Sequence, residues 1–201
     1  MSSNSEIIDE ILDYFQQEGT QDYIGGVISK KDHSIQCGML AELDGQPLNV
    51  ILGAFLHDLG HMVGERHSKG RMVDPGTNTY IGSKNHGVLG AEFLAERGFG
   101  TDVTDFVRYH VQAKRYLCWK VNEYHDKLDW ASKRTLEHQG GPMNQKQAEK
   151  FQQLPNFEAI IKVRHFDEAA KDPNWTDLKS LDYFKQLALN YLNNNCGKSF
   201  E

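Results

Sequence analysis

The fold is decided by residues 50–63, which read VILGAFLHDLGHMV. Apolar residues fill most of these positions, which predicts one helix over residues 49–63 that is buried on most sides. His57 and His61 would share a face of this helix, with Asp58 about 100° away around its axis. Burying these polar groups is costly unless they form hydrogen bonds or bind a metal. We therefore expect either local hydrogen bonds or a metal site.

Further helices carry residues of the types that bind metals. The candidates are His33 in a helix over 33–43, His86 before a helix over 88–97, His110 at the end of a helix over 102–110, and Asp167 in a helix over 157–171. A lone histidine on an apolar face is more often a satisfied core residue. Four histidines and two aspartates on separate segments instead favour a shared metal centre. Mixed histidine and carboxylate ligands suit iron, manganese or zinc and do not choose among them.

Composition limits the classes of protein to consider. The chain has 201 residues, which suits a single domain over 1–201, and its formal net charge of −6 argues against a nucleic-acid surface. No apolar run approaches 18 residues and the first ten residues do not resemble a signal peptide, so no membrane contact is expected. Three widely spaced cysteines indicate reduced thiols and a cytoplasmic protein.

The remaining segments complete an all-α prediction. Residues 6–18 have the apolar spacing of an amphipathic first helix, and residues 177–193 that of a last one. The metal-site core would span 23–171. No strand is predicted. Residues 64–84 form a long, glycine-containing connection, which we interpret as a lid or wall of the site because long loops in compact domains are usually functional.

The order of the six candidate ligands resembles the HD-domain superfamily, and the likeness covers residues 33–167. It implies a helical bundle and the ligand set of the two-metal members: His33, His57, Asp58, His86, His110 and Asp167. Asp58 would bridge two ions, one of them completed by His33, His57 and Asp167 and the other by His86 and His110. Such sites usually hydrolyse phosphate esters with a bridging hydroxide. A structural or signalling module is disfavoured, because a complete ligand set would then be idle.

Within this superfamily, the chain is most similar to the PhnZ-type oxygenases, which use two irons and O2 to cleave a carbon–phosphorus bond. Tyr23 matches the mobile tyrosine that ligates one iron until substrate arrives. The resemblance also implies a phosphonate site made of His61, Lys114, Ser132, Thr135 and Arg164. The guanidinium of Arg164, the ammonium of Lys114 and the hydroxyl groups of Ser132 and Thr135 together suit a phosphonate dianion. Taken singly, each of these residues would be interpreted as a solvated surface residue.

One position departs from the PhnZ-type pattern. Gly26 stands where that family has a glutamate that binds the primary ammonium of its substrate. A trimethylammonium group has no N–H donor and is recognised by aromatic faces. Loss of the glutamate deletes the acceptor and opens space. Candidate cage residues besides Tyr23 are Tyr80, Tyr116, Trp119 and Trp130, although most aromatic residues of a helical domain belong to its core.

This pattern resembles the TmpB-like members of the family. Their reaction implies a mixed-valent Fe(II)/Fe(III) pair with O2 as co-substrate. The small-molecule substrate would be (R)-1-hydroxy-2-(trimethylammonio)ethylphosphonate, supplied by an upstream hydroxylase and cleaved to glycine betaine and phosphate. Two alternatives stay open. One is the same chemistry on 2-amino-1-hydroxyethylphosphonate, giving glycine and phosphate, and the other is a two-metal phosphohydrolase that works without O2.

Overall fold

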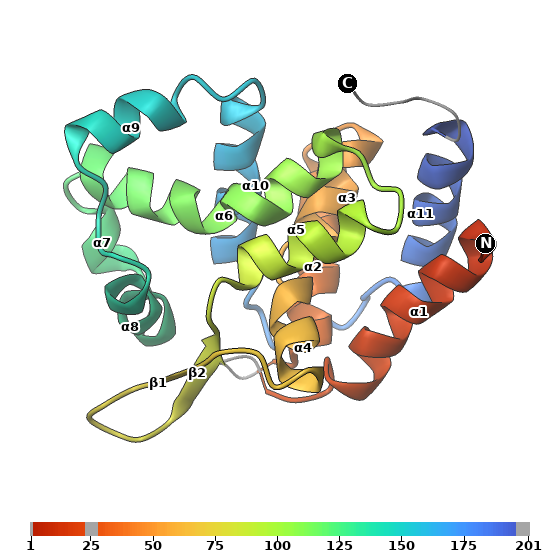
Figure 1. Cartoon of the computed structure of the whole chain (residues 1–201), viewed down its shortest axis with the longest axis horizontal. Helices are drawn as coiled ribbons and strands as arrows, with labels where there is room; N and C mark the ends of the chain where they lie inside the picture. Colours follow the sequence, from red (N-terminus) through yellow and green to blue (C-terminus); the bar gives the residue numbers. More distant parts are fainter. Residues whose placement is uncertain (1, 23–27, 196–201) are drawn as a thin grey trace.

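The computed structural model describes residues 2–22 and 28–195, which form a bundle of helices with one small hairpin (Figure 1). The helices are α1 (Asn4–Gln17), α2 (Lys30–Leu43), α3 (Leu48–Leu56), α4 (Leu59–Arg66), α5 (His86–Ala95), α6 (Thr101–Lys120), α7 (Tyr124–Lys127), α8 (Trp130–His138), α9 (Gln145–Phe151), α10 (Phe157–Ala169) and α11 (Leu181–Asn195). The strands are β1 (Arg71–Val73) and β2 (Tyr80–Ser83). The predicted helical bundle is confirmed. No described helix combines the length and apolar character needed to cross a membrane.

Helix α3 lies at the centre of the bundle, with α2, α6, α10 and α11 packed around it. All its residues from Val50 to Leu56 are buried. The ring of Phe55 is stacked between Phe15 of α1 and Phe184 of α11, with ring centroids 4.7 and 4.2 Å apart. A Cβ on Gly53 would lie 2.4 Å from the ring of Phe106, so α3 and α6 approach closely. The C-terminal end of α3 is therefore held firmly where the polar residues begin.

The single helix predicted over residues 49–63 is wrong, because the chain breaks between α3 and α4. His57 ends α3 and Asp58 precedes α4, with φ −98° and ψ 5° at Asp58. The Nδ1 atom of His57 bonds the carbonyl oxygen of Ala54 at 2.7 Å, and the carbonyl of Asp58 accepts the N–H of His61 at 2.9 Å. On either side of this break, the side chains of His57 and Asp58 lie together in one buried centre, with His57 Nε2 3.3 Å from Asp58 Oδ2.

The expected irregular connection over residues 64–84 is also wrong. Helix α4 continues to Arg66, and strands β1 and β2 then pair antiparallel, with Arg71 opposite Ser83 and Val73 opposite Tyr80. Both strands are too short to show a clear alternating pattern. Asp74 organises the turn and lies 3.1 Å from Arg134 of α8. The hairpin is thereby fixed against α8, one wall of the site described below.

Several helix boundaries differ from the prediction. Helix α2 begins three residues before His33, where the side chain of Ser29 accepts the N–H of Asp32. Helix α6 continues ten residues beyond His110, and the last helix is Leu181–Asn195 rather than 177–193. The extension of α6 matters for the site, because it places Lys114 one turn beyond His110 on the same helix.

Candidate metal centre and anion pocket

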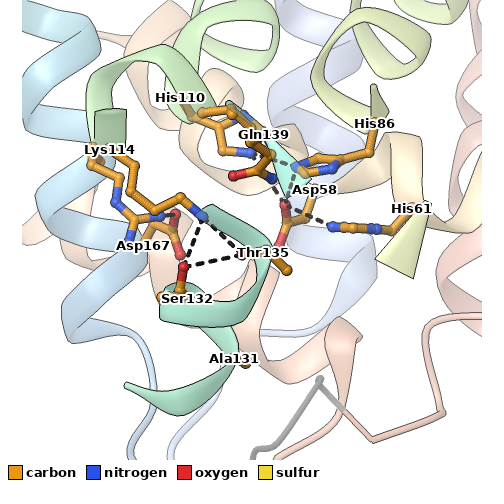
Figure 2. Close-up of a pocket in the computed structure, with 12 residues that line it drawn as sticks. Asp58, His61, His86, His110, Lys114, Ala131, Ser132, Thr135, Gln139 and Asp167 are labelled. Carbon is orange, nitrogen blue, oxygen red and sulfur yellow. Dashed lines mark hydrogen bonds and ion pairs between the residues drawn. The ribbon is translucent and has the colours of Figure 1, made fainter. Parts of the chain in front are cut away.

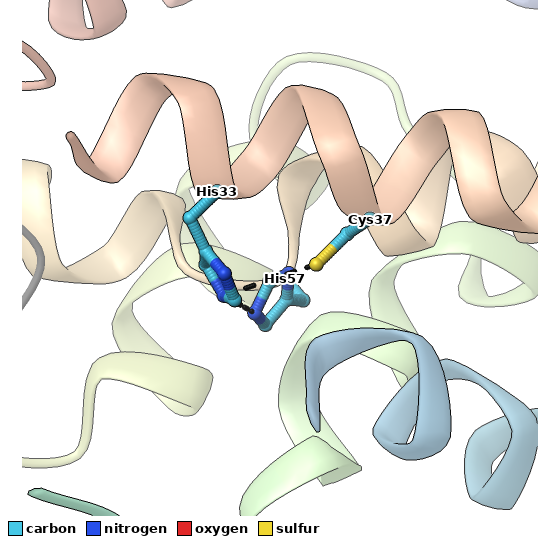
Figure 3. A group of neighbouring side chains, drawn as sticks. All are labelled: His33, Cys37 and His57. Atoms are coloured by element: carbon cyan, nitrogen blue, oxygen red, sulfur yellow. Dashed lines mark hydrogen bonds between the residues drawn. The ribbon is translucent and has the colours of Figure 1, made fainter. Parts of the chain in front are cut away.

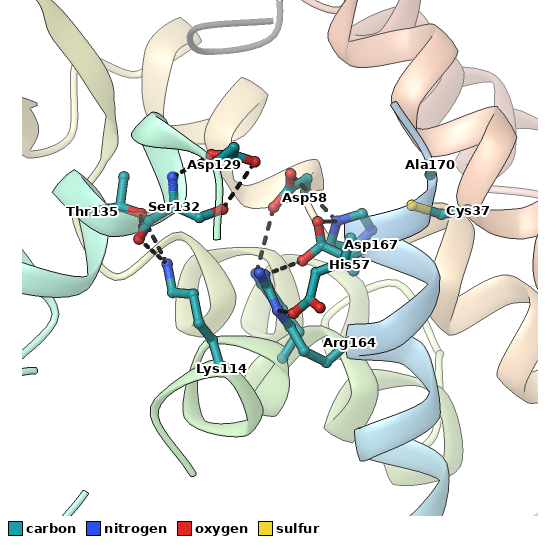
Figure 4. A network of polar contacts seen from close by, with 12 residues as sticks. Cys37, His57, Asp58, Lys114, Asp129, Ser132, Thr135, Arg164, Asp167 and Ala170 are labelled. Carbon is teal, nitrogen blue, oxygen red and sulfur yellow. Dashed lines mark hydrogen bonds and ion pairs between the residues drawn. The ribbon is translucent and has the colours of Figure 1, made fainter. Parts of the chain in front are cut away.

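Four side chains from α2, the α3–α4 turn and α10 converge on one point. The Nε2 atom of His33 lies 3.3 Å from His57 Nε2 and 3.3 Å from Asp167 Oδ1, and His57 Nε2 lies 3.3 Å from Asp58 Oδ2 (Figures 3 and 4). Ligands bound at about 2 Å from a common ion lie about 3 to 3.5 Å from one another. The four atoms therefore have the spacing of a metal coordination shell.

A second group forms on the other side of Asp58. His86 Nε2 and His110 Nε2 are 2.9 Å apart, and they lie 3.6 and 3.4 Å from Asp58 Oδ1. One carboxylate oxygen of Asp58 thus faces the first group (Figure 4), and the other faces the second (Figure 2). This is the geometry of a carboxylate that bridges two ions. All six residues are at most 6% exposed.

The hydrogen bonds of the histidines decide which ring nitrogen is available to a metal. Each Nδ1 faces a backbone carbonyl oxygen at 2.7 to 3.2 Å: His33 that of Ala170, His57 that of Ala54, His86 that of Ser83 and His110 that of Val107. A carbonyl only accepts, so each Nδ1 carries the proton and each Nε2 offers a lone pair. Facing lone pairs require a cation between them.

The surroundings of Asp167 provide a further test of whether these residues could hold metal ions. Its Oδ1 is buried and has no hydrogen-bond donor, although it faces the Nε2 atoms of His33 and His57. A buried carboxylate oxygen without a partner is costly unless a cation neutralises it. The described residues therefore fit two metal ions. Mixed nitrogen and oxygen ligation is compatible with iron.

His61 differs from these four histidines. Its Nδ1 accepts the backbone N–H of Ser83 at 3.0 Å, so its proton is on Nε2, which lies 3.9 Å from Asp58 Oδ1. Burial lowers the pKa of His61 to about 4, which keeps the ring neutral at pH 7. An Nε2 that carries a proton cannot ligate a metal but can donate a hydrogen bond. His61 is thus built as a donor beside the second group.

Ser83 at the end of β2 was not found from the sequence. Its N–H fixes the tautomer of His61, while its carbonyl accepts from Nδ1 of His86 and fixes the opposite tautomer. Its hydroxyl lies 3.2 Å from the carbonyl oxygen of His61 and 3.0 Å from the Tyr80 hydroxyl. The backbone of Ser83 performs this function, so its side chain gave no signal in the sequence.

A cavity beside the second group is lined by Lys114 of α6, Ser132 and Thr135 of α8, and Arg164 of α10 (Figure 2). Lys114 is 4% exposed, and its Nζ donates to Thr135 Oγ1 at 2.8 Å and to the Ser132 carbonyl at 3.3 Å. No carboxylate of the described residues forms an ion pair with it. Burial, together with the nearby Arg164, lowers the pKa of Lys114 to about 7. An anion in this cavity would restore the full charge of Lys114.

Arg164 connects this cavity with the metal centre (Figure 4). Its Nη1 forms an ion pair with Asp167, and its Nε donates to Glu168 at 2.8 Å and to the Tyr124 hydroxyl at 3.2 Å. Its Nη2 is buried without a partner, which leaves a donor for a ligand in the cavity that Arg164 lines. Tyr124 and Glu168 were missed from the sequence because neither belongs to the recognised pattern. Burial raises the pKa of Glu168 to about 7.

The predicted ammonium cage is not assembled by the described residues. Tyr23 and Gly26 lie outside them. The Arg71 guanidinium lies 4.6 Å from the centroid of the Tyr80 ring and occupies one of its faces. Tyr116 packs against Phe151, Phe157 and Trp119, and Trp130 is 44% exposed at the start of α8. The residues found to line the cavity include none of these four aromatics but do include Gln139, which was not predicted.

Buried histidines and aspartates that converge from several helices of one bundle define a helical metal-binding protein. Residues 31–163 match the HD domain family, and the chain belongs to this family.

Three relatives cover most of the chain. It is 38% identical to the [1-hydroxy-2-(trimethylamino)ethyl]phosphonate dioxygenase (glycine-betaine-forming) of Leisingera caerulea, over 90% of this chain and 87% of that protein. It is 30% identical to the hydroxymethylphosphonate dioxygenase of Gimesia maris, over 83% and 79%. It is also 34% identical to the uncharacterized protein L432 of Acanthamoeba polyphaga mimivirus, over 92% and 81%.

Proposed function

We propose that the protein is an O2-dependent diiron oxygenase that cleaves the carbon–phosphorus bond of (R)-1-hydroxy-2-(trimethylammonio)ethylphosphonate. The observation that carries this proposal is the bridging position of Asp58 between two ligand groups, next to a cavity that holds two cations, Lys114 and Arg164. Two relatives named as phosphonate dioxygenases support the reaction class, and one of them carries the name of this substrate.

The proposed reaction balances without a further reductant. The substrate and O2 give glycine betaine, hydrogen phosphate and one proton. The C1–H and C1–P bonds break, one oxygen atom of O2 enters the new carboxylate, and the other enters the phosphate. A mixed-valent Fe(II)/Fe(III) pair, when bound by the six ligands, would supply the activation of O2 and bind the C1 hydroxyl.

The chain's own residues would bind and orient the phosphonate. Arg164 has an NH2 group at Nη2 whose two N–H bonds are unpaired, and Lys114 has an ammonium that forms no ion pair with a described carboxylate. His61 offers its Nε2–H. The hydroxyl groups of Ser132 and Thr135 line the same cavity, where they donate to Asp129 and to the Ser132 carbonyl and would turn to the phosphonate when it binds. These groups would neutralise the dianion and hold C1 next to the metal pair, which is where most of the protein's contribution arises.

We propose that Gly26 makes the enzyme choose the trimethylammonium substrate over the primary amine. A glycine offers no carboxylate to a primary ammonium and leaves room for three methyl groups. The same chemistry on 2-amino-1-hydroxyethylphosphonate is the nearer alternative. Because both substrates carry a C1 hydroxyl, we propose that a cytoplasmic hydroxylase acts before this enzyme.

Phosphate release from the purified, iron-loaded protein tests the proposal. Both hydroxyphosphonates and a generic phosphomonoester are supplied with O2 and under argon. We expect O2-dependent release of phosphate and glycine betaine from the trimethylammonium compound. If only the primary amine is turned over, the proposed O2-dependent reaction stands, but the proposed role of Gly26 in substrate choice is wrong. Equal release from the ester under argon would identify a two-metal hydrolase instead.

A further inference from the structure

A second cavity of about 250 Å³ lies between the start of α5, the middle of α6 and the end of α8. Its wall contains four basic side chains: Lys84, Arg108, Arg115 and His138. Among the described residues that line it, there is no aspartate or glutamate. This local excess of positive charge contrasts with the net charge of −6 of the whole chain. A concave site of one charge sign raises the local concentration of ions of the opposite sign.

Helix α5 adds backbone donors to the same cavity. The helix begins at His86 and has ten residues, and its N-cap residue Asn85 forms no side-chain hydrogen bond with the first turn. Gly87 and Val88 of that turn line the cavity. The N–H groups of a first helical turn have no partner within the helix, and the helix dipole favours an anion there. These donors reinforce the basic side chains.

The second cavity adjoins the metal pocket. His86, Val111 and Gln139 line both, so these three side chains form the partition between them. Figure 2 shows Gln139 next to the second ligand group, close to His86 and His110. The Oε1 atoms of Gln139 and Gln112, which also lines the second cavity, are buried and accept no hydrogen bond. The cavity is therefore lined by several donors and lies beside the metal pocket.

We propose that this basic cavity binds hydrogen phosphate next to the metal pocket. The dianion has three unprotonated oxygens for the cations and backbone N–H groups, and one P–OH donor for a glutamine oxygen. Binding itself follows from the described residues. A role as the exit site of the phosphate released at the metal centre rests in addition on the proposed function.

Titration calorimetry with inorganic phosphate, on the metal-loaded protein, tests this site. We expect two classes of binding site. Arg108→Gln or Lys84→Gln should weaken one class roughly tenfold, the loss typical of one charge-assisted hydrogen bond. Lys114→Gln should weaken the other. Lys120→Gln removes a charge from an exposed position of the same helix α6 and should change neither.

A single class that Lys114→Gln weakens and Arg108→Gln and Lys84→Gln leave unchanged would overturn the proposal. Should Arg108→Gln lower the thermal midpoint, the exposed Lys84 decides the question, because its substitution leaves the core intact. Absence of O2-dependent phosphate release would remove the exit role but would not alter the expected titration. The failure of this site and the failure of the proposed function are thus separate results.

Discussion

Substitution of Lys114 by methionine should stabilise the protein while removing phosphonate binding. Burial lowers the pKa of this ammonium from its ordinary value of 10.5 to about 7. Holding the group in the fold at pH 7 therefore costs about 4 kcal/mol relative to the unfolded chain. Methionine has a similar length and no charge, but it loses the hydrogen bond to Thr135, worth about 1 kcal/mol. The expected gain is about 3 kcal/mol.

The pH dependence of this gain has a definite sign. The unfolded chain binds the proton of Lys114 up to pH 10.5, whereas the folded protein releases it near pH 7. The wild-type protein should therefore become more stable, relative to the methionine variant, as the pH rises through this window. The advantage of Lys114→Met should be complete below pH 7 and nearly absent at pH 10.5.

Urea denaturation of metal-free protein at several pH values measures this effect. Lys120→Met, at an exposed position of the same helix, is the control and should change stability by less than about 0.5 kcal/mol. If Lys114→Met instead destabilises the protein at pH 7, the lysine is a structural connection between α6 and α8. The claim that Lys114 serves to bind an anion, at a cost in stability, would then be refuted.

Three further predictions concern the metal centre and its support. Asp58→Asn should lose both metal ions, measured as metal content, because one oxygen faces each ligand group; retention of one ion would contradict the bridge. His61→Leu should keep both ions and weaken phosphonate affinity roughly tenfold, since His61 is a donor and not a ligand; metal loss would contradict this role. Gly60→Ala should destabilise the protein by about 3 kcal/mol in urea denaturation, because its Cβ would lie 1.8 Å from the His86 carbonyl oxygen. A neutral Gly60→Ala variant would show that α4 and α5 can separate.

Residue types and their order along the chain were enough to select six side chains that the structure brings together. Histidine and aspartate are costly to bury, so their presence in apolar helices was informative before any geometry was known. The helical bundle followed from apolar spacing in the same way. The structure brings the six predicted ligands together, and it places Lys114 and Arg164 at one cavity beside them.

Features that depend on the backbone or on distant packing could not be predicted. The break between α3 and α4 leaves no mark in an apolar sequence that suits a continuous helix. Ser83 acts through its N–H and carbonyl groups, which every residue except proline has. Aromatic residues are equally suited to a core and to a cation cage, and Tyr116 is packed in the core. The sequence could not distinguish these two uses.

Turnover of the trimethylammonium hydroxyphosphonate under ¹⁸O2, with mass analysis of both products, tests the central claim most directly. The account predicts one labelled oxygen in the carboxylate of glycine betaine and one in the phosphate. Hydrolysis at the two-metal centre would take its oxygen from water. Phosphate that forms under ¹⁸O2 without label, or that forms equally under argon, would contradict the assignment of this centre as an oxygenase.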